Sequence, residues 1–212
     1  MPAALKTTLL LASPYITFSP AFAASFTRFK SISIAINEIL GAGNSLNTLI
    51  RDTSDRNFVT YHFSGFDPKY GGSGLDTVSY VLAMEEISKI DASASVVMSV
   101  NNSLVCWGLE KYGSEEQKLK YLVPLAKGEK IGAFCLSEPE AGSDATSQRT
   151  TAIDMGDHYL LNGTKNWITN GSSASIYLVI AQTNPELGHK GINALIVERG
   201  MEGFVVGAKE DK

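Results

Sequence analysis

The hydrophobic pattern of the chain changes its period at Gly128, and this change limits the folds that the sequence can form. From Leu75 to Ile87 the apolar residues recur at spacings of three to five, as on one face of an amphipathic helix. After Gly128 the apolar residues stand in short runs rich in β-branched and aromatic side chains, divided by Gly, Asn, Asp and Pro. Helices followed by strands, without alternation of the two, predict an α+β protein with a helical part and a separate β part.

The helical part is expected to contain three helices. The first covers Leu75–Ile87. The next stretch, "ASASVVMSVNNSLVCWGLEKYG", is rich in small residues and predicts a helix that packs closely among others and ends near Gly113. Ser114 followed three residues later by Gln117 is a capping-box signature, which predicts a third, short helix toward Pro124.

The β part is expected to form an antiparallel, barrel-like sheet. Its predicted strands are "IGAFCLS", "RTTAIDMG", "HYLLNGT", "KNWITN", "SIYLVIAQT", "INALIVER" and "GFVVGA". The run "KNWITN" lies between the pairs Asn162-Gly163 and Asn170-Gly171, which favour turns because Asn and Gly tolerate positive φ. We therefore expect a short strand at Trp167–Thr169, with the indole and the hydroxyl on one face.

The regions expected from these patterns are 1–65, which is unassigned, 66–128, which is helical, and 129–212, which is the β domain. Residues 1–24 contain one Lys, an apolar run and Ala21-Phe22-Ala23, which are the parts of a secretory signal. Pro14 interrupts that run, and a transit peptide would need more Arg. We favour an atypical N-terminal segment over either signal. No apolar run approaches the roughly 20 residues of a membrane span.

Composition excludes several classes of protein. The formal net charge of −4 over 212 residues gives no basic field for nucleic acid. The sequence contains neither GxGxxG after a strand nor GxxxxGK[ST], and it contains no GxSxG elbow. Cys106 and Cys135 lie far apart in the sequence and in no Cys/His cluster, so we expect no metal site and two reduced core thiols.

Two segments of the β part could carry chemistry. The loop "LSEPEAGSD", Leu136–Asp144, follows the first strand and offers backbone N–H groups and hydroxyls that can hold an oxygen ligand. Trp167 offers a flat apolar face, and Thr169 a hydroxyl, to a planar cofactor. Each pattern alone more often marks a plain turn or a half-buried sheet face. Their occurrence together, about thirty residues apart, favours a binding site.

These residues resemble a known family. "AMEEISK", "AFCLSEPEAGSDAT", "YLLNGTKNWITNG" and "GINALIVERG", in this order and with these gaps, are similar to the flavin-dependent acyl-CoA dehydrogenases, most closely the short-chain (butyryl-CoA) type. The resemblance extends from about Phe66 to Lys212. It implies an N-terminal helical domain, a middle β domain and a C-terminal four-helix domain, with FAD as cofactor and dehydrogenation of an acyl-CoA to the trans-2-enoyl-CoA in fatty-acid β-oxidation or related metabolism.

The resemblance also implies roles for individual residues. Ser137 would contact the pyrimidine side of the flavin, Trp167 would lie against the ring face, and the Thr169 hydroxyl would point toward the flavin N5. Ser143 would lie near the phosphates and the acyl-CoA, and so would also bind substrate. The implied cofactor-binding residues are Phe134, Cys135, Leu136, Ser137, Glu138, Pro139, Gly142, Ser143, Trp167, Ile168 and Thr169.

In this family the catalytic base is a Glu of the C-terminal domain, and no residue of this chain matches it, so we assign no catalytic residue. We therefore expect a truncated member of the family. The resemblance implies an electron-transferring flavoprotein as electron acceptor and a homo-oligomer, usually a tetramer. The expected location is the cytoplasm of a bacterium or the mitochondrial matrix of a eukaryote. The alternatives are a non-catalytic flavin-binding or folding-incompetent fragment and an acyl-CoA oxidase.

Overall fold

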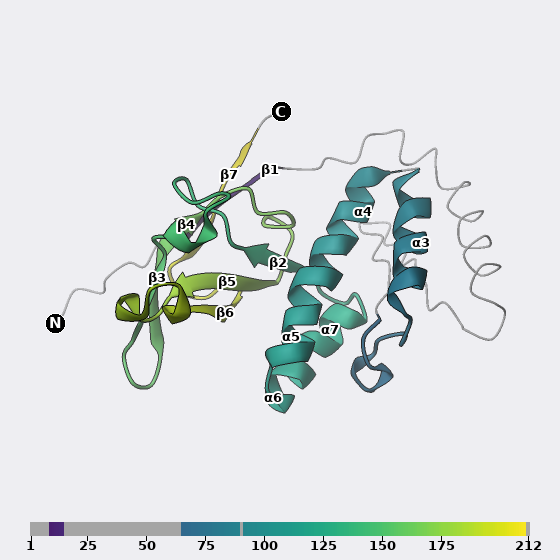
Figure 1. The fold of residues 1–212 in the computed structure, drawn as a ribbon, viewed down its shortest axis with the longest axis horizontal. Coiled ribbons are helices and arrows are strands. Elements are labelled where there is room, and N and C mark those ends of the chain that lie inside the picture. The colour runs from purple at the N-terminus through teal and green to yellow at the C-terminus, as the bar shows by residue number, and fades with distance from the viewer. Residues whose placement is uncertain (1–8, 15–64, 90, 211–212) are drawn as a thin grey trace. The chain divides into compact units, whose positions relative to one another are not determined.

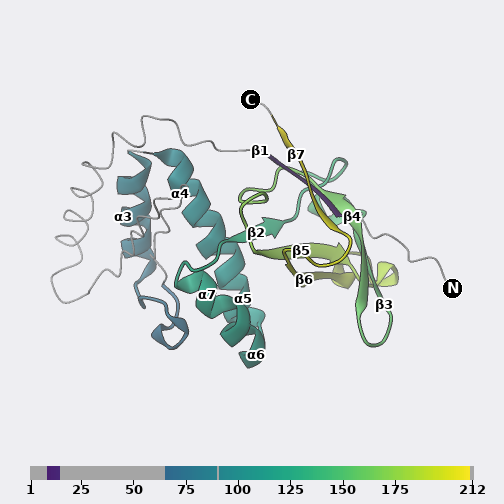
Figure 2. The same cartoon turned by 180° about the vertical axis from the view of Figure 1, so that it is seen from behind.

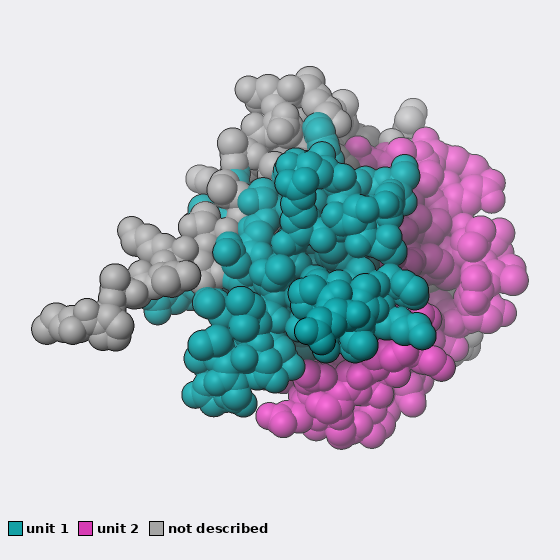
Figure 3. Space-filling model, turned by 60° about the vertical axis from the view of Figure 1, so that its left-hand side comes forward, with its two compact units in different colours: residues 1–15, 131–212 teal, residues 16–130 magenta. Residues whose placement is uncertain are grey.

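The computed structural model describes residues 9–14, 65–89 and 91–210. The chain divides into two compact units, coloured separately in Figure 3. One unit comprises residues 16–130 and contains the helices. The other comprises residues 1–15 and 131–212 and contains the strands. The prediction of a helical part followed by a β part is therefore confirmed.

The helical unit is built around one long helix that changes its winding along its length. Its consecutive segments α4, η2 and α5 run on without a break in Figures 1 and 2, and η2 is a π-helical stretch. The bounds in this unit are η1 Pro68–Tyr70, α3 Thr77–Ser88, α4 Ala92–Ser99, η2 Val100–Cys106, α5 Trp107–Tyr112, α6 Glu115–Gln117, η3 Lys118–Leu122 and α7 Val123–Ala126.

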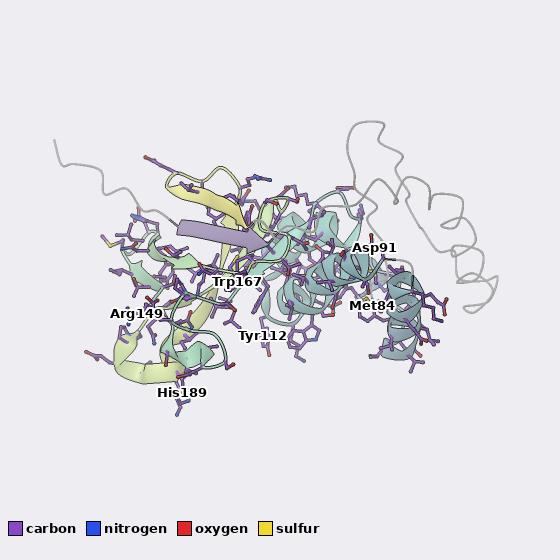
Figure 4. All side chains as sticks on the ribbon, turned by 90° about the horizontal axis from the view of Figure 1, so that it is seen from above. Met84, Asp91, Tyr112, Arg149, Trp167 and His189 are labelled. Atoms are coloured by element: carbon purple, nitrogen blue, oxygen red, sulfur yellow. The ribbon has the colours of Figure 1, made fainter. Side chains whose placement is uncertain are left out.

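Side-chain caps fix where these helices begin. The Asp91 carboxylate accepts hydrogen bonds from the N–H groups of Ser93 and Ala94 at the start of α4, close to where Figure 4 labels Asp91. Ser114 and Gln117 form the predicted capping box, with Ser114 Oγ accepting from the Gln117 N–H at 3.2 Å. The three predicted helices are thus confirmed, and the third continues through η3 into α7.

The core of the helical unit is largely apolar, and its buried cysteine forms no disulfide. Ile87, Val105 and Leu122 are fully buried, and Cys106 lies among the core residues with a free thiol. Burial raises the pKa of the Cys106 thiol well above its ordinary value, so the thiol stays protonated and unreactive. Cys135 of the β unit is buried and free in the same way. Both cysteines are core thiols, as predicted.

The β unit is a sheet of seven strands. The strand order is β2-β5-β3-β4-β1-β7. The remaining strand, β6, does not belong to this series and pairs with β5 (Figures 1 and 2). The strands are β1 Leu9–Pro14, β2 Gly132–Cys135, β3 Thr151–Asp154, β4 Tyr159–Lys165, β5 Ile176–Gln182, β6 Ile192–Glu198 and β7 Phe204–Glu210. Two short 3-10 helices, η4 Ala145–Ser147 and η5 Pro185–Gly191, lie in the loops.

The sheet is mixed, which corrects the expectation of purely antiparallel pairing. β3 pairs antiparallel with β4, and β5 with β6, but β2 lies parallel to β5, and β1 lies parallel to both β4 and β7. Parallel pairing needs a connection of a dozen or more residues, and the chain between Cys135 and Ile176 provides one. Alternation within one strand does not reveal which strand will lie beside it.

The N-terminal segment contributes one strand to this sheet. β1, Leu9–Pro14, lies within residues 1–24, where the sequence contains the parts of an export signal. The remaining expectations for residues 1–65, including the signal itself, lie outside the described residues.

The segment Trp167–Thr169 is not a strand, contrary to prediction. β4 ends at Lys165, and the backbone of Trp167 is left-handed, with φ of 58°, which breaks the extended conformation. Asn162 and Gly163 lie inside β4 and form no turn. A Cβ at Gly163 would come within 2.7 Å of the Thr150 Cα. The close approach of the backbone at Thr150 therefore favours glycine at this position.

The second Asn-Gly pair does form the predicted turn. Asn170 has φ of 66°, which asparagine tolerates better than most residues. The turn continues through Gly171 and leads to β5. Ile168, between Trp167 and Thr169, is buried in the core of the sheet, whose members are Ala133, Cys135, Ile168, Ala174, Tyr177, Val179 and Val197.

Candidate functional site

The structure brings the two candidate segments of the sequence together. The loop that begins at Leu136 follows β2, and the turn that contains Trp167 follows β4. The N–H of Asn166 donates a hydrogen bond to the carbonyl oxygen of Ser137 at 2.8 Å, so the two segments are joined by a backbone contact. The thirty residues between them form β3, β4 and the loops of this unit, and they return the chain to the end of β2.

A buried ion pair lies beneath this contact. Lys165 Nζ is 2.6 Å from Glu138 Oε1, and the two side chains are only 0% and 2% exposed. The ammonium group also donates to the Leu136 carbonyl oxygen at 2.9 Å and to Gln148 Oε1 at 3.0 Å. A lysine ammonium has three protons to donate, and here each has an acceptor. Lys165 is therefore held in a single position by three separate parts of the loop.

The carboxylate of Glu138 joins the start of the loop to its end. Oε2 accepts a hydrogen bond from the Arg149 N–H at 2.5 Å, and Oε1 accepts one from the Thr150 N–H at 3.0 Å. Burial alone would raise the pKa of Glu138, but the hydrogen bonds from Lys165, Thr150 and Arg149 outweigh burial and lower that pKa. Burial lowers the pKa of Lys165, and Glu138 opposes that shift. Each charged group thus favours the charged form of the other.

These contacts leave backbone donors open at the start of the loop. The carbonyl oxygens of Leu136 and Ser137 are occupied by Lys165 and Asn166. The N–H groups of Leu136 and Ser137 donate to no group among the described residues, although both residues are half-buried. Each of these N–H groups can therefore donate to an electron-rich ligand atom.

Trp167 lies beside these donors in an unusual conformation. A left-handed backbone is rare for a bulky residue and costs free energy, so it often marks a functional site. The Trp167 side chain, labelled in Figure 4, is 53% exposed, whereas Ile168 is 2% exposed and packs in the core. Thr169 is half-buried. Ile168 anchors the turn in the core, while Trp167 is exposed and Thr169 is only partly covered.

A second set of hydrogen bonds fixes the turn that follows Trp167. The Tyr177 hydroxyl lies 2.8 Å from the Gly171 carbonyl oxygen and 2.9 Å from that of Ala174, and can donate to either. Arg199 Nη2 donates to the Ser172 carbonyl oxygen at 2.6 Å. Asn170 Nδ2 donates to the Gly132 carbonyl oxygen at 3.1 Å, which ties the turn to β2. Burial raises the pKa of Tyr177 to about 12, so the phenol remains a donor at neutral pH.

The other predicted site residues lie along the first segment with differing access. Phe134 is half-buried, and Cys135 is fully buried, so Cys135 could offer a ligand only its backbone. Pro139, Gly142 and Ser143 are exposed in the loop. Asp144, at its end, accepts hydrogen bonds from the Thr146 N–H and hydroxyl and from the Ser147 hydroxyl, and these bonds lower its pKa.

Comparison with known proteins agrees with this architecture. The model of the acyl-CoA dehydrogenase N-terminal domain matches residues 35–129, and the model of the acyl-CoA dehydrogenase middle domain matches residues 133–212. The chain belongs to the acyl-CoA dehydrogenase family. The first match begins ahead of Phe66, where the motifs noted in the sequence begin.

Relatives of the chain within the acyl-CoA dehydrogenase family include short-chain enzymes. It is 49% identical over 147 residues to the short-chain specific acyl-CoA dehydrogenase of Clostridium acetobutylicum, covering 69% of this chain and 39% of that protein. It is 51% identical over 142 residues to the human mitochondrial short-chain specific enzyme, covering 67% of this chain and 34% of that protein. The chain therefore spans about two fifths or less of the length of these relatives.

The fold agrees with that of a solved member of the acyl-CoA dehydrogenase family. The structure of butyryl-CoA dehydrogenase from Megasphaera elsdenii matches with a TM-score of 0.69 and 40% sequence identity, covering 91% of this chain and 48% of that one. No helix in the described part of the present chain has both the length and the apolar character to cross a membrane.

The sequence motifs of this acyl-CoA dehydrogenase chain did not reveal the residues that position its site. Lys165, Asn166, Asn170, Tyr177 and Arg199 make the contacts that hold the two segments. The sequence contained one signal for Lys165, which is its position at the end of a predicted strand. A lysine that is buried at such a position needs a partner. Tyr177 and Arg199 gave none, because their acceptors are backbone carbonyls.

We expect Tyr177→Phe to lower the free energy of unfolding by about 1–2 kcal/mol, because it removes the one buried O–H that can donate to the carbonyl oxygen of Gly171 or of Ala174. Tyr159→Phe is the matched control, since Tyr159 is 52% exposed. Urea denaturation of both variants measures the difference. Equal stability of Tyr177→Phe and wild type would show that the hydroxyl does not hold the turn.

The ion pair predicts an acid-dependent loss of stability. The pKa of Glu138 is lowered by folding, so its contribution is present above the unfolded-state pKa of about 4.3 and is lost as the pH falls through the lower folded-state value. The double variant Glu138→Gln/Lys165→Met removes both charges and should show a shallower fall of unfolding free energy below about pH 4.3.

The matched control for this measurement is Glu140→Gln, because Glu140 is exposed and its nearest cation, Arg149, lies 3.7 Å away at the surface. Urea denaturation at a series of pH values from 7 to 3 gives the slopes. The interpretation fails if the double variant and the control lose stability along the same curve as wild type.

Proposed function

We propose that this protein is an FAD-dependent acyl-CoA dehydrogenase with a preference for short acyl chains. It would remove one hydrogen from each of the α and β carbons of an acyl-CoA and release the trans-2-enoyl-CoA. The observation that carries the proposal is the pair of open N–H groups at Leu136 and Ser137 beside the exposed Trp167. The two family matches and the short-chain relatives support it.

The donor set fits an isoalloxazine ring. The N–H groups of Leu136 and Ser137 and the Ser137 hydroxyl would bond to the pyrimidine edge, which is rich in acceptors. The indole of Trp167 would cover the ring face, and the Thr169 hydroxyl would approach N5. When bound, FAD would supply the acceptor for the hydrogen that leaves the β carbon. Phe134, Cys135, Glu138, Pro139, Gly142 and Ile168 would shape the segments that carry these groups, and Ser143 would lie near the acyl-CoA.

The residues of this chain would bind and orient, and the acid-base step needs a further group. Removal of the α proton requires a carboxylate base, and we assign none of the described residues to that role. The two segments that carry Ser137 and Trp167 would exclude water and hold the flavin rigidly against the acyl thioester. An electron-transferring flavoprotein would take the electrons onward, and the enzyme would work as a homo-oligomer in the cytoplasm or the mitochondrial matrix.

Binding of FAD to the chain tests the proposal. We expect Trp167→Ala to raise the dissociation constant for FAD by about tenfold, because the ring loses its aromatic neighbour. Tyr159→Ala, which removes an exposed aromatic ring from the β3–β4 hairpin, should leave the constant unchanged. Equilibrium dialysis gives both values without relying on tryptophan fluorescence. Binding that is absent in wild type, or equal in both variants, would count against a flavin site here.

A further inference from the structure

The peptide group between Leu136 and Ser137 is bonded to a buried cation. Lys165 Nζ donates to the Leu136 carbonyl oxygen at 2.9 Å, and the Lys165 side chain is fully buried. The N–H of the same peptide group belongs to Ser137, and it donates to no acceptor within the described parts of the chain. One side of this peptide is therefore bonded to an ammonium group, while the N–H on the other side is open to a ligand.

The neighbouring peptide groups do not share this arrangement. The Ser137 carbonyl oxygen accepts from Asn166, but the N–H of that peptide belongs to Glu138 and donates to the Ala141 carbonyl oxygen at 3.0 Å. The N–H of Leu136 belongs to the peptide whose carbonyl is that of Cys135, and Lys165 does not bond to it. Among these three peptides, only the one between Leu136 and Ser137 joins the ammonium group to an open donor.

Hydrogen bonds in a chain strengthen one another, because each polarises the groups it joins. A charged donor on the carbonyl oxygen withdraws electron density from the amide, which makes its N–H a stronger donor. The effect is larger at a buried group, where the effective dielectric constant is below that of water. The negative charge of Glu138 cancels the field of the Lys165 ammonium group at long distances. The direct hydrogen bond from Lys165 to the Leu136 carbonyl oxygen still polarises that peptide group.

We propose that Lys165 is a positioning residue that polarises the peptide between Leu136 and Ser137, so that the Ser137 N–H prefers an anionic ligand edge. This inference rests on the proposed function, in which that edge is the pyrimidine side of the flavin. Uptake of two electrons and one proton converts oxidised FAD to an anion with its charge on this side of the ring. Lys165 therefore favours binding of reduced FAD over oxidised FAD.

The ratio of two dissociation constants tests the inference. Equilibrium dialysis under anaerobic conditions, with oxidised FAD and with dithionite-reduced FAD, gives the ratio for each protein. We expect wild type to bind reduced FAD more tightly. In Glu138→Gln/Lys165→Met, which leaves no unpaired buried charge, the preference should shrink by about fivefold. This is less than the loss of a direct charged hydrogen bond, because Lys165 acts on the flavin through the peptide group.

Tyr177→Phe serves as the structural control, because it loosens the neighbouring turn without a contact to Lys165. It should weaken binding of both forms of FAD by the same factor and leave the ratio unchanged. A purely structural role for Lys165 would give the double variant this same result, and that outcome overturns the inference.

The wild-type chain alone also decides the matter if the double variant does not fold. Equal affinity of wild type for oxidised and reduced FAD overturns the inference and leaves the proposed function standing. No binding of either form overturns the proposed function, and the inference with it.

Discussion

The buried ion pair between Glu138 and Lys165 is the contact on which the candidate site depends. A buried salt bridge adds little net stability, because removing two charges from water costs about as much as their attraction returns. This pair gives the loop a defined shape. Lys165 reaches the start of the loop at Leu136 and its later part at Gln148, and Glu138 bonds to the backbone at Arg149 and Thr150. The loop is thereby tied at its start and at its later part.

These contacts use the carbonyl oxygens at the start of the loop and leave the N–H groups there open. At Leu136 and Ser137 the carbonyl oxygens accept from the protein's own donors, and the N–H groups can donate to a ligand. The turn after β4 is held in a comparable way, since Tyr177, Arg199 and Asn170 bond to backbone carbonyl oxygens and leave Trp167 exposed. Rigid elements that carry open donors and an aromatic face can bind a flat, polar-edged cofactor without large rearrangement. The left-handed backbone of Trp167 is consistent with this role, because unfavourable conformations persist where surrounding contacts fix them.

The sequence predicted much of the fold and part of the site. Apolar spacing located α3, and the content of small residues located the long helix. The capping box at Ser114 was correct, and six strands matched short apolar runs. Parallel pairing of β2 with β5 could not be predicted, because long-range partners leave no mark on local alternation. Trp167 was misplaced on a strand because nothing in "KNWITN" requires positive φ of a tryptophan. Lys165 was overlooked because its partner, Glu138, lies 27 residues away.

The most direct test of the central claim is amide NMR of the chain titrated with FAD. If the contacts of Lys165 and Asn166 leave Leu136 and Ser137 as open donors to a flavin, their amide protons should shift strongly downfield and exchange more slowly when FAD is added. The amide of Glu138, which already donates to Ala141, should change little. Unchanged shifts and exchange rates at Leu136 and Ser137, in a chain shown to bind FAD, would contradict the claim that these donors hold the cofactor.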